Sequence, residues 1–233
     1  MIQHKSYILI YQKYIKRILD IIFSFIAILV LSPIMITIAI LVRTNLGTPI
    51  IFKQKRPGKN ENIFEMYKFR SMTNEKDSNG NLLPDELRLS HFGKKLRETS
   101  LDELPELFNI LKGDMSIVGP RPQLIKDMVF MTPHQRKRHT VLPGLTGLAQ
   151  INGRNNIAWD EKIKWDLQYI QNISFHLDLA IIVITIYKVL KRKDIATNGL
   201  ETSEDLGDYL LRTGKIDITQ YTKTLQQLKY YCS

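Results

Sequence analysis

An apolar run of 25 residues, 18–42, constrains this chain more than any other feature, because it contains only one charged side chain, Asp20. A helix of that length is long enough to cross the hydrocarbon core of a bilayer. Ser32 and Pro33 lie near its middle, where a proline removes one backbone hydrogen bond and clashes with the preceding turn. The run is longer than the apolar part of a signal peptide, and no small-x-small cleavage site follows it. We therefore expect a membrane helix that breaks at Ser32 and Pro33.

Basic residues flank both ends of this run. Residues 1–60 hold nine cations and one anion, and so account for +8 of the net charge of +10. Lys and Arg clusters stay on the cytoplasmic side of a membrane, so a segment flanked by them at both ends enters and leaves on the same face. The sequence therefore predicts a re-entrant helix over residues 1–43, with the rest of the chain on the cytoplasmic face. A single crossing is the alternative, which reporters fused to both termini would distinguish.

The excess of positive charge limits the classes of partner. A basic surface also fits nucleic-acid binding, but cations around a long apolar run favour an anionic membrane surface. We therefore expect anionic phospholipid of a membrane, and no nucleic acid, as a partner. The single cysteine, Cys232, excludes an internal disulfide and favours a reducing compartment. The histidines fit no metal-ligand spacing and no catalytic triad; they are His4, His91, His134, His139 and His176.

The rest of the chain indicates an α+β fold that is mostly helical. Residues 50–55 and 63–70 are rich in β-branched and aromatic side chains, and Pro57 and Gly58 between them are a turn signal. This pattern predicts a small β-hairpin. Polar residues 73–86 predict a loop.

Helical spacing of apolar residues appears in several later stretches. Residues 87–96 show it with an interrupting glycine, and residues 159–170 show it clearly, with Trp159 on the apolar face. Residues 177–190 are apolar but too short to span a membrane comfortably, so we expect an amphipathic helix at the membrane interface, with a buried core helix as the alternative. Residues 194–233 read as a polar linker and two short helices, at 203–212 and 217–230.

Residues 99–108, TSLDELPELF, place the carboxylates of Asp102 and Glu103 side by side. Ser100 and Glu103 have the spacing of a capping box, which favours an ordinary helix start. Pro105 argues against that cap, because a helix capped by Ser100 would contain the proline in its interior.

A helix that starts between Asp102 and Leu104 would tolerate the proline in its first turn. It would run to Lys112, with Gly113 after it. The two carboxylates would then lie at a helix start, where exposed amides favour phosphate.

Two further loops have a composition suited to ligands. Pro120 and Pro122 stiffen a loop and hold Arg121 between them, either toward a phosphate or as a solvated side chain of a rigid turn. Gly144, Gly147 and Gly153 would allow the backbone to approach a ligand closely, although the GK[ST] ending of a P-loop is absent.

Phosphoryl transfer is the chemistry that this inventory supports. Carboxylates can hold Mg²⁺, an aspartate can accept a phosphoryl group, and guanidinium groups bind phosphate bidentately. In a cationic membrane protein, these groups indicate transfer between a soluble and a lipid substrate. The candidate phosphate-binding cations are Lys68, Arg70, Arg97, Arg121 and Arg154.

Three long motifs occur in order: YKFRSM at 67–72, ELRLSHFGKKLRETSLDELPELFNILKGDMSIVGPRP at 86–122, and RHTVLPGLTGLAQINGRN at 138–155. Together they resemble the bacterial sugar transferase family, the small monotopic polyprenyl-phosphate phosphoglycosyl transferases, over residues 11–193. The resemblance implies that a UDP-sugar gives its phosphosugar to undecaprenyl phosphate and releases UMP. It is nearest to the initiating transferases of protein N-glycosylation, which implies an N-acetylated UDP-hexose and the first membrane step of glycoconjugate synthesis.

The resemblance also implies roles for residues. Asp102 matches the nucleophile that carries the phosphosugar, and Glu103 matches its partner in handling Mg²⁺ or a proton. Basic active-site positions match Lys68, Arg97 and Arg154, and Arg121 lies in the Pro-Arg-Pro motif near the nucleotide, between Pro120 and Pro122. Ser32 and Pro33 match the helix break of the family.

Three regions follow from these expectations: a membrane helix over 1–43, a cytoplasmic catalytic domain over 44–193, and a helical extension over 194–233. The extension exceeds the minimal catalytic unit, and covering the site, binding a partner and supporting a homodimer are all open roles for it. The alternative to an enzyme is a non-catalytic basic membrane anchor or scaffold, which predicts that Asp102→Asn leaves every activity intact.

Overall fold

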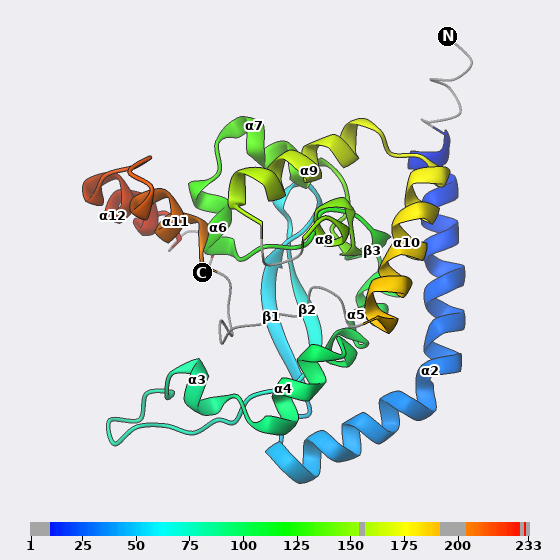
Figure 1. Cartoon of the computed structure of the whole chain (residues 1–233), viewed down its shortest axis with the longest axis horizontal. Coiled ribbons are helices and arrows are strands. Elements are labelled where there is room, and N and C mark those ends of the chain that lie inside the picture. Colours follow the sequence, from blue (N-terminus) through cyan, green and yellow to red (C-terminus); the bar gives the residue numbers. More distant parts are fainter. Residues whose placement is uncertain (1–9, 154–156, 192–203, 229–230, 232–233) are drawn as a thin grey trace.

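The computed structural model describes residues 10–153, 157–191, 204–228 and 231. Helices predominate, and the described part contains two small two-stranded sheets, which confirms the mostly helical α+β class. Figure 1 shows the long helix α2 along one side, the β1–β2 hairpin in the middle, and α11 and α12 on the opposite side. Cys232 and His4 lie outside the described residues.

The apolar run forms one bent helix. A π-helical turn, Tyr11–Ile15, leads directly into α2, Lys16–Leu46, which continues through Pro33. Figure 1 shows that the two halves of α2 run in different directions. Pro33 lacks the amide that would bond to the carbonyl of Leu29, and the Ser32 hydroxyl donates to that carbonyl at 2.8 Å instead. The expected break is therefore a bend inside a continuous helix, because Ser32 replaces the missing donor.

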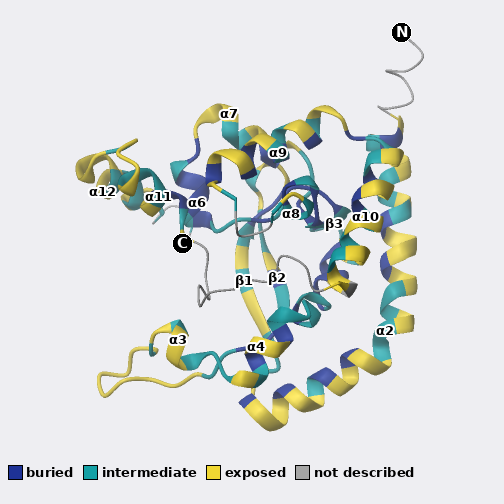
Figure 2. Cartoon of the chain, viewed as in Figure 1, coloured by how far each residue is buried: buried dark blue, intermediate teal, exposed yellow. Residues whose placement is uncertain are grey.

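The outward side of α2 is strongly apolar. Of the described helices, only that over Tyr11–Leu46 is long and apolar enough to cross a membrane, by length and composition. Figure 2 shows that its outer side is exposed along most of its length. This exposure indicates membrane association, because large apolar patches of this kind mark contact with a membrane or a partner. The exposed side chains include Ile18, Ile22, Phe23, Phe25, Leu29, Val30, Ile36 and Ile40.

The inward side of α2 packs on the body of the protein. Met35, Ile38 and Val42 are buried in a cluster with Phe69 of the hairpin and Leu96. The membrane helix is therefore joined to the body through its own apolar side chains, and its second half forms part of the core.

The predicted hairpin is confirmed. Strands β1, Ile51–Pro57, and β2, Ile63–Phe69, pair antiparallel, and Phe52 lies opposite Lys68. A short 3₁₀ turn, Lys59–Glu61, joins them. Asn109 then covers the outer edge of β2, since its Oδ1 accepts the Tyr67 amide at 3.0 Å and its Nδ2 donates to the Glu65 carbonyl at 2.7 Å. A buried asparagine thus takes the place of a third strand and fixes a helix to this edge.

A second, parallel sheet was not expected from the sequence. It pairs β3, Ser116–Val118, with β4, Gly144–Thr146. A Cβ on Gly144 would lie 2.0 Å from the Gly119 amide nitrogen, and one on Gly147 would lie 2.1 Å from the Gly119 carbonyl oxygen. Gly144 and Gly147 therefore allow two backbone segments of the protein to meet, and the approach of this loop to a ligand stays a prediction.

The helix expected over 87–96 is divided in two. α3, Asp85–Arg88, ends at Leu89, and α4, His91–Glu98, begins after Ser90, whose hydroxyl accepts the Gly93 amide at 3.1 Å. A serine N-cap starts a new helix here, which the apolar spacing alone did not reveal.

The remaining helices form the upper part of Figure 1. α9 and α10 confirm the helices expected over 159–170 and 177–190. In α9 Trp159 and Ile163 are buried, as expected, while in α10 side chains such as Val183 are exposed. The bounds are α6, Ile125–Phe130; α7, Pro133–Arg136; a 3₁₀ turn, Lys137–Thr140; α8, Leu148–Ile151; α9, Trp159–Gln171; and α10, Phe175–Leu190.

One buried carboxylate joins α2, α9 and α10. Asp178 accepts hydrogen bonds from Tyr11 at 2.7 Å and from Tyr169 at 2.8 Å, and pairs with Lys16 at 2.5 Å. Because Tyr11 and Lys16 come from the distant beginning of the chain, Asp178 fixes α10 beside the beginning of α2.

The two short helices expected near the C-terminus are confirmed, with narrower bounds. They are α11, Leu206–Arg212, and α12, Ile218–Gln226. Both lie against the end of the molecule formed by α6 and α9 (Figure 1).

Candidate active site

The two adjacent carboxylates lie in a single turn before a helix. A 3₁₀ turn, Leu101–Glu103, precedes α5, Glu106–Lys112. Ser100 has a left-handed backbone, with φ of 55°, and its side chain caps nothing, so the Ser100 capping box is absent. The expected helix start was early by a few residues, because Pro105 directly precedes the first residue of α5. The expected end at Lys112 with Gly113 after it is confirmed.

Contacts from two other elements hold this turn in place. Asn109 in α5 ties the helix to the edge of β2, as described above. At the other end, Arg17 of α2 donates to the carbonyls of Ile110 at 2.6 Å and Leu111 at 3.0 Å. These carbonyls belong to the last turn of α5, where cations are favoured. The membrane helix and the hairpin together therefore position the acidic turn.

Five charged side chains meet at this turn, and we call them the acid–base cluster: Lys68, Asp102, Glu103, Glu106 and Arg121. Glu103 Oε1 lies 2.7 Å from Lys68 Nζ and 2.7 Å from Arg121 Nη2. Lys68 Nζ also lies 3.2 Å from Glu106 Oε1. Asp102 is only 7% exposed and Glu106 only 1%. In this partly desolvated cluster, the charges of two cations act on three carboxyl groups.

The three carboxyl groups have different pKa values. Burial, and next the charge of Glu103, raise the pKa of Asp102 to about 6. Burial alone would also raise the pKa of Glu103, but Arg121 and Lys68 hold that pKa well below its usual range. Burial raises the pKa of Glu106 to about 7. Glu103 is therefore ionised at neutral pH. Burial and the nearby charge of Glu103 destabilise the ionised form of Asp102, and a destabilised carboxylate is suited to act as a nucleophile.

The structure brings some of the expected site residues together. Arg121 pairs with Glu103, so its reading as a solvated side chain of a rigid turn is wrong. Pro120 and Pro122 are buried on either side of it. Arg97 donates from Nε to the Ser71 hydroxyl at 2.9 Å, and its charge acts on Asp102 by lowering the pKa of that group.

Arg70 does not belong to the cluster. It is buried, and its Nη1 donates to the carbonyl of Thr48 at 2.6 Å. This guanidinium supports the backbone where α2 joins β1, and the phosphate-binding role of Arg70 stays a prediction. Arg154 lies outside the described residues.

Glu106 is a member of the cluster that sequence reasoning missed. It follows Asp102 by four residues and Glu103 by three, the spacing that places side chains on one side of a helical turn. That spacing was the available signal. It is not specific, because glutamate is common in the first turn of a helix for structural reasons.

The chemistry of the donors fits Mg²⁺. Across the described ranges, no group of three or more His, Cys, Asp or Glu side chains is arranged to hold a metal ion. Mg²⁺ in phosphate-transfer sites is bound by one or two carboxylates, and substrate phosphates and water complete its coordination. Asp102 and Glu103 supply two carboxylates, so a metal here would depend on a bound phosphate.

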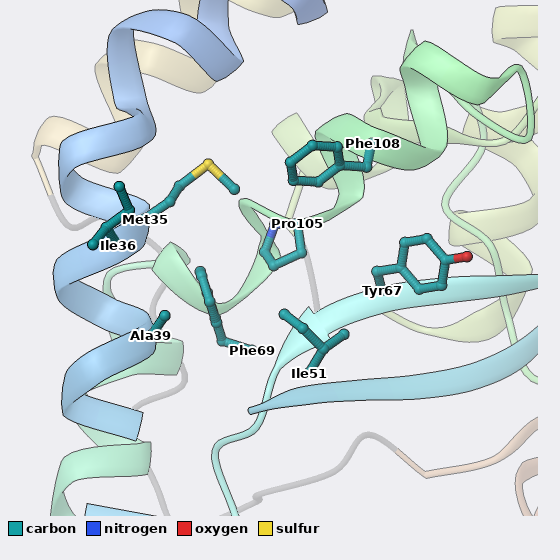
Figure 3. Close-up of a pocket in the computed structure, with 8 residues that line it drawn as sticks. All are labelled: Met35, Ile36, Ala39, Ile51, Tyr67, Phe69, Pro105 and Phe108. Atoms are coloured by element: carbon teal, nitrogen blue, oxygen red, sulfur yellow. The ribbon is translucent and has the colours of Figure 1, made fainter. Parts of the chain in front are cut away.

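An apolar groove lies between α2 and the hairpin, next to Pro105 (Figure 3). Its volume is about 250 Å³. Pro105 in its wall follows Glu103 by two residues, while Tyr67 and Phe69 lie on the face of β2 opposite to Lys68, because successive side chains of a strand point to opposite faces. Pockets that enclose a whole small-molecule ligand have ~300–1,000 Å³, so this groove suits a short stretch of hydrocarbon. The lining residues are Met35, Ile36, Ala39, Ile51, Tyr67, Phe69, Pro105 and Phe108.

Fold and site thus define a membrane-associated protein with a buried acid–base cluster suited to phosphate. The chain belongs to the bacterial sugar transferase family, whose model matches residues 11–192. It is 52% identical over 171 residues to the uncharacterized sugar transferase EpsL of Bacillus subtilis (strain 168), which covers 73% of this chain and 84% of the relative.

Two longer relatives have more specific names. The chain is 41% identical over 183 residues to the UDP-glucose:undecaprenyl-phosphate glucose-1-phosphate transferase of Klebsiella pneumoniae, over 74% of this chain and 39% of the relative. It is 39% identical over 185 residues to the UDP-N-acetylgalactosamine-undecaprenyl-phosphate N-acetylgalactosaminephosphotransferase of Aeromonas hydrophila, over 76% of this chain and 44% of the relative. The chain therefore spans less than half the length of these two proteins.

Proposed function

We propose that this protein is a phosphoglycosyl transferase that moves a sugar phosphate from a UDP-sugar to undecaprenyl phosphate and releases UMP. The observation that carries the proposal is the pairing of a buried, high-pKa Asp102 with a Glu103 held by Lys68 and Arg121. The names of the two longer relatives support the two substrates. The reaction would begin the synthesis of a polysaccharide or another glycoconjugate on the membrane.

Asp102 is the proposed nucleophile. In the first half-reaction its carboxylate oxygen attacks the phosphorus that bears the sugar, the bond to the bridging oxygen breaks, and UMP leaves with the electron pair. In the second, a phosphate oxygen of the lipid attacks the same phosphorus, the bond to Asp102 breaks, and the carboxylate is regenerated. A covalent intermediate lets two bulky substrates use one site in turn.

The cations of the cluster stabilise the charge that develops during transfer. Arg121 and Lys68 contact Glu103 and are close enough to serve phosphate oxygens beside Asp102. Donors already in place cost no reorganisation at the moment of reaction. The charge of Arg97 lowers the pKa of Asp102 and so favours its ionised form. Arg154 is proposed to bind phosphate. When bound to Asp102 and Glu103, Mg²⁺ would neutralise charge on the transferring phosphoryl group.

The acceptor lipid is proposed to lie with its first isoprene units in the apolar groove. The groove is apolar and of the right size for a short stretch of chain, and it joins the membrane helix to the acidic turn (Figure 3). Ala39→Phe, which fills the groove, should raise the KM for undecaprenyl phosphate about tenfold, since each buried CH₂ contributes ~0.8 kcal/mol. UMP release in the absence of acceptor should be unchanged; a loss of that step as well would contradict this placement of the lipid.

The membrane geometry is proposed to be re-entrant, on the cytoplasmic face of the bacterial inner membrane. The bend of α2 at Pro33 and the basic residues at both of its ends support this geometry. The exposed apolar side of α10 supports its place at the membrane interface. One leaflet then suffices to bring a lipid phosphate to the acidic turn.

Asp102→Asn tests the function. With a UDP-sugar labelled in the phosphate next to the sugar, the native protein should retain label after denaturation and release UMP. The variant should lose both by at least about 1,000-fold. Asp114→Asn, at the other end of α5, is the matched control and should behave as the native protein. Undiminished UMP release by Asp102→Asn would contradict the role of Asp102, whereas the absence of UMP release from the native protein would favour the membrane-anchor alternative.

The donor sugar is proposed to be an N-acetylated hexose. The names of the relatives include both glucose and N-acetylgalactosamine, so the family alone leaves the choice open. Incubation with undecaprenyl phosphate and UDP-N-acetylglucosamine, UDP-N-acetylgalactosamine, UDP-glucose or UDP-galactose in turn, with UMP as the readout, tests the proposal. Faster release from an unacetylated sugar would contradict it.

A further inference from the structure

The segment that follows the family's catalytic unit packs closely on the body. The family model ends at residue 192, whereas the described residues 204–228, which we call the extension, form α11 and α12. Leu206, the first residue of α11, is only 1% exposed and packs with Trp159 and Met131. The Trp159 indole donates to the Glu204 carbonyl at 2.9 Å. The extension is therefore anchored at its beginning, in the core between α6 and α9.

Asp127 in α6 joins the extension to the start of its own helix. It is only 2% exposed. Its Oδ1 accepts the Leu206 amide at 2.9 Å, and its Oδ2 accepts the Leu124 amide at 3.0 Å. Lys126 and Asp205 add an ion pair beside it. One buried carboxylate thus bonds both the first turn of α11 and the first turn of α6.

The far end of α6 is held by the extension as well. A Cβ on Gly207 would lie 2.6 Å from the ring of Phe130, so only a glycine allows α11 to approach this closely. Tyr221 of α12 also stacks on the Phe130 ring, with 5.3 Å between the ring centroids. A helix of six residues has little stability of its own, so the position of α6 depends on these contacts.

α6 directly follows the loop that carries Arg121. Three carbonyls of this loop have donors from the body: Pro120 accepts from Gly144 at 3.0 Å, Arg121 from Arg138 at 2.6 Å, and Pro122 from Arg56 at 3.2 Å. The end of the loop is fixed by the bond from Leu124 to Asp127. The same Asp127 carboxylate also accepts the Leu206 amide of the extension.

We propose that the extension is a brace that sets the position of Arg121 in the acid–base cluster, with Asp127 and Gly207 as positioning residues. It acts through α6, whose start fixes the end of the Arg121 loop. The effect on catalysis rests on the proposed function, while the effect on the loop does not.

Hydrogen exchange of the full chain in detergent tests the brace without any assay of activity. Gly207→Val places two methyl groups against the Phe130 ring, and Leu206→Ala removes the apolar anchor; both change the extension alone. Each should make residues 116–124 exchange about tenfold faster, because local opening is set by the contacts that hold a segment closed. Arg212→Gln, on an exposed face of α11, is the control and should change nothing there. Unchanged exchange of residues 116–124 in both variants would overturn the proposal, whether or not the extension itself exchanges faster.

A double-mutant cycle tests the route through Arg121. Gly207→Val should slow single-turnover UMP release about tenfold, and should cause no further loss in an Arg121→Ala background, because coupled residues are not additive. The same loss in both backgrounds, or no loss in the native background, would mean that the extension does not act through Arg121. If Arg121→Ala has native activity, the proposed role of Arg121 in catalysis fails, while the exchange result still decides the brace.

Discussion

Arg121 Nη2 donates to Glu103 Oε1 at 2.7 Å, and this contact distinguishes the two adjacent carboxylates of the acidic turn. Glu103 has two cations on one oxygen and is held ionised. Asp102, next to it in the chain, is buried and has the higher pKa. Since like charges so close together oppose each other's ionisation, the permanent charge of Glu103 contributes to the elevated pKa of Asp102.

The first prediction concerns the pH dependence of the first half-reaction. A nucleophilic Asp102 must be ionised, and its pKa is about 6. The rate of UMP release without acceptor, at one fixed Mg²⁺ concentration, should therefore rise about tenfold per pH unit below pH 6 and level off near pH 7. The control is Glu106→Gln, in which this acidic limb should stay in place. A limb that moves with this substitution would assign the titration to Glu106.

The second prediction concerns Lys68. Lys68→Met keeps the length of the side chain but removes one of the two cations on Glu103 and one proposed phosphate contact. Single-turnover UMP release should fall about 100-fold, the loss typical of removing one preorganised donor. Lys53→Met, in the neighbouring strand, removes a cation that pairs with the exposed Glu65 and should leave the rate unchanged. Equal rates for the two variants would show that the charge of Lys68 is not used.

The third prediction concerns the stability cost of the cluster. Because the pKa of Glu106 rises from 4.5 to about 7 on folding, the unfolded chain releases this proton more readily. The native state therefore loses stability as the pH rises from 4.5 to 7, and does not regain it above. Glu106→Gln avoids that loss and should be more stable than the native protein at pH 8 by on the order of 3 kcal/mol.

Denaturant unfolding in detergent at pH 4.5 and pH 8 measures this difference. The gain should be absent at pH 4.5, where the native Glu106 is already protonated. Glu65→Gln, on the exposed side of β2, is the control and should show no gain in stability at pH 8. A Glu106→Gln protein that is less stable than the native one at pH 8 would mean that the ion pair with Lys68 outweighs burial.

The fourth prediction concerns the path of α2 in the membrane. In a chain with Cys232→Ser, cysteines introduced at Tyr14 and at Thr44 lie at exposed positions near the two ends of the helix. A maleimide that cannot cross membranes should label both in inverted vesicles and neither in intact cells without an outer membrane. Pro33→Ala restores the missing amide and should straighten the helix, so position 44 should become labelled from the other side. Labelling of the two positions from opposite sides in the chain that retains Pro33 would show a single crossing.

The sequence by itself was sufficient where a pattern is local. The spacing of apolar side chains along the chain reflects which of them are buried. It was enough to predict the long apolar helix, the hairpin over 50–70 and the helix α9. Pro33 predicted a distortion of α2, and Pro105 predicted that Ser100 caps no helix. The motifs identified the family, and with it the candidate residues Asp102 and Glu103.

Local patterns were not sufficient where backbone contacts are distant. The parallel pairing of β3 and β4 joins segments that have three residues each, too short to show a period. The serine that divides α3 from α4 was visible in the sequence, but apolar spacing on either side of it concealed the break. The hydroxyl of Ser32 turned an expected break into a bend, which depends on the geometry of one hydrogen bond.

The arrangement of charge was decided by the tertiary structure alone. The sequence offered five candidate phosphate-binding cations, but packing buries Arg70 against the Thr48 carbonyl and brings Lys68 and Arg121 to Glu103. Glu106 joined the site only because the same packing placed it beside Lys68. The sequence determined which chemical groups this protein has, since that is a property of each residue. The tertiary structure decided which carboxylate is held ionised and which has a raised pKa, because a pKa depends on burial and on partners that lie far apart in the chain.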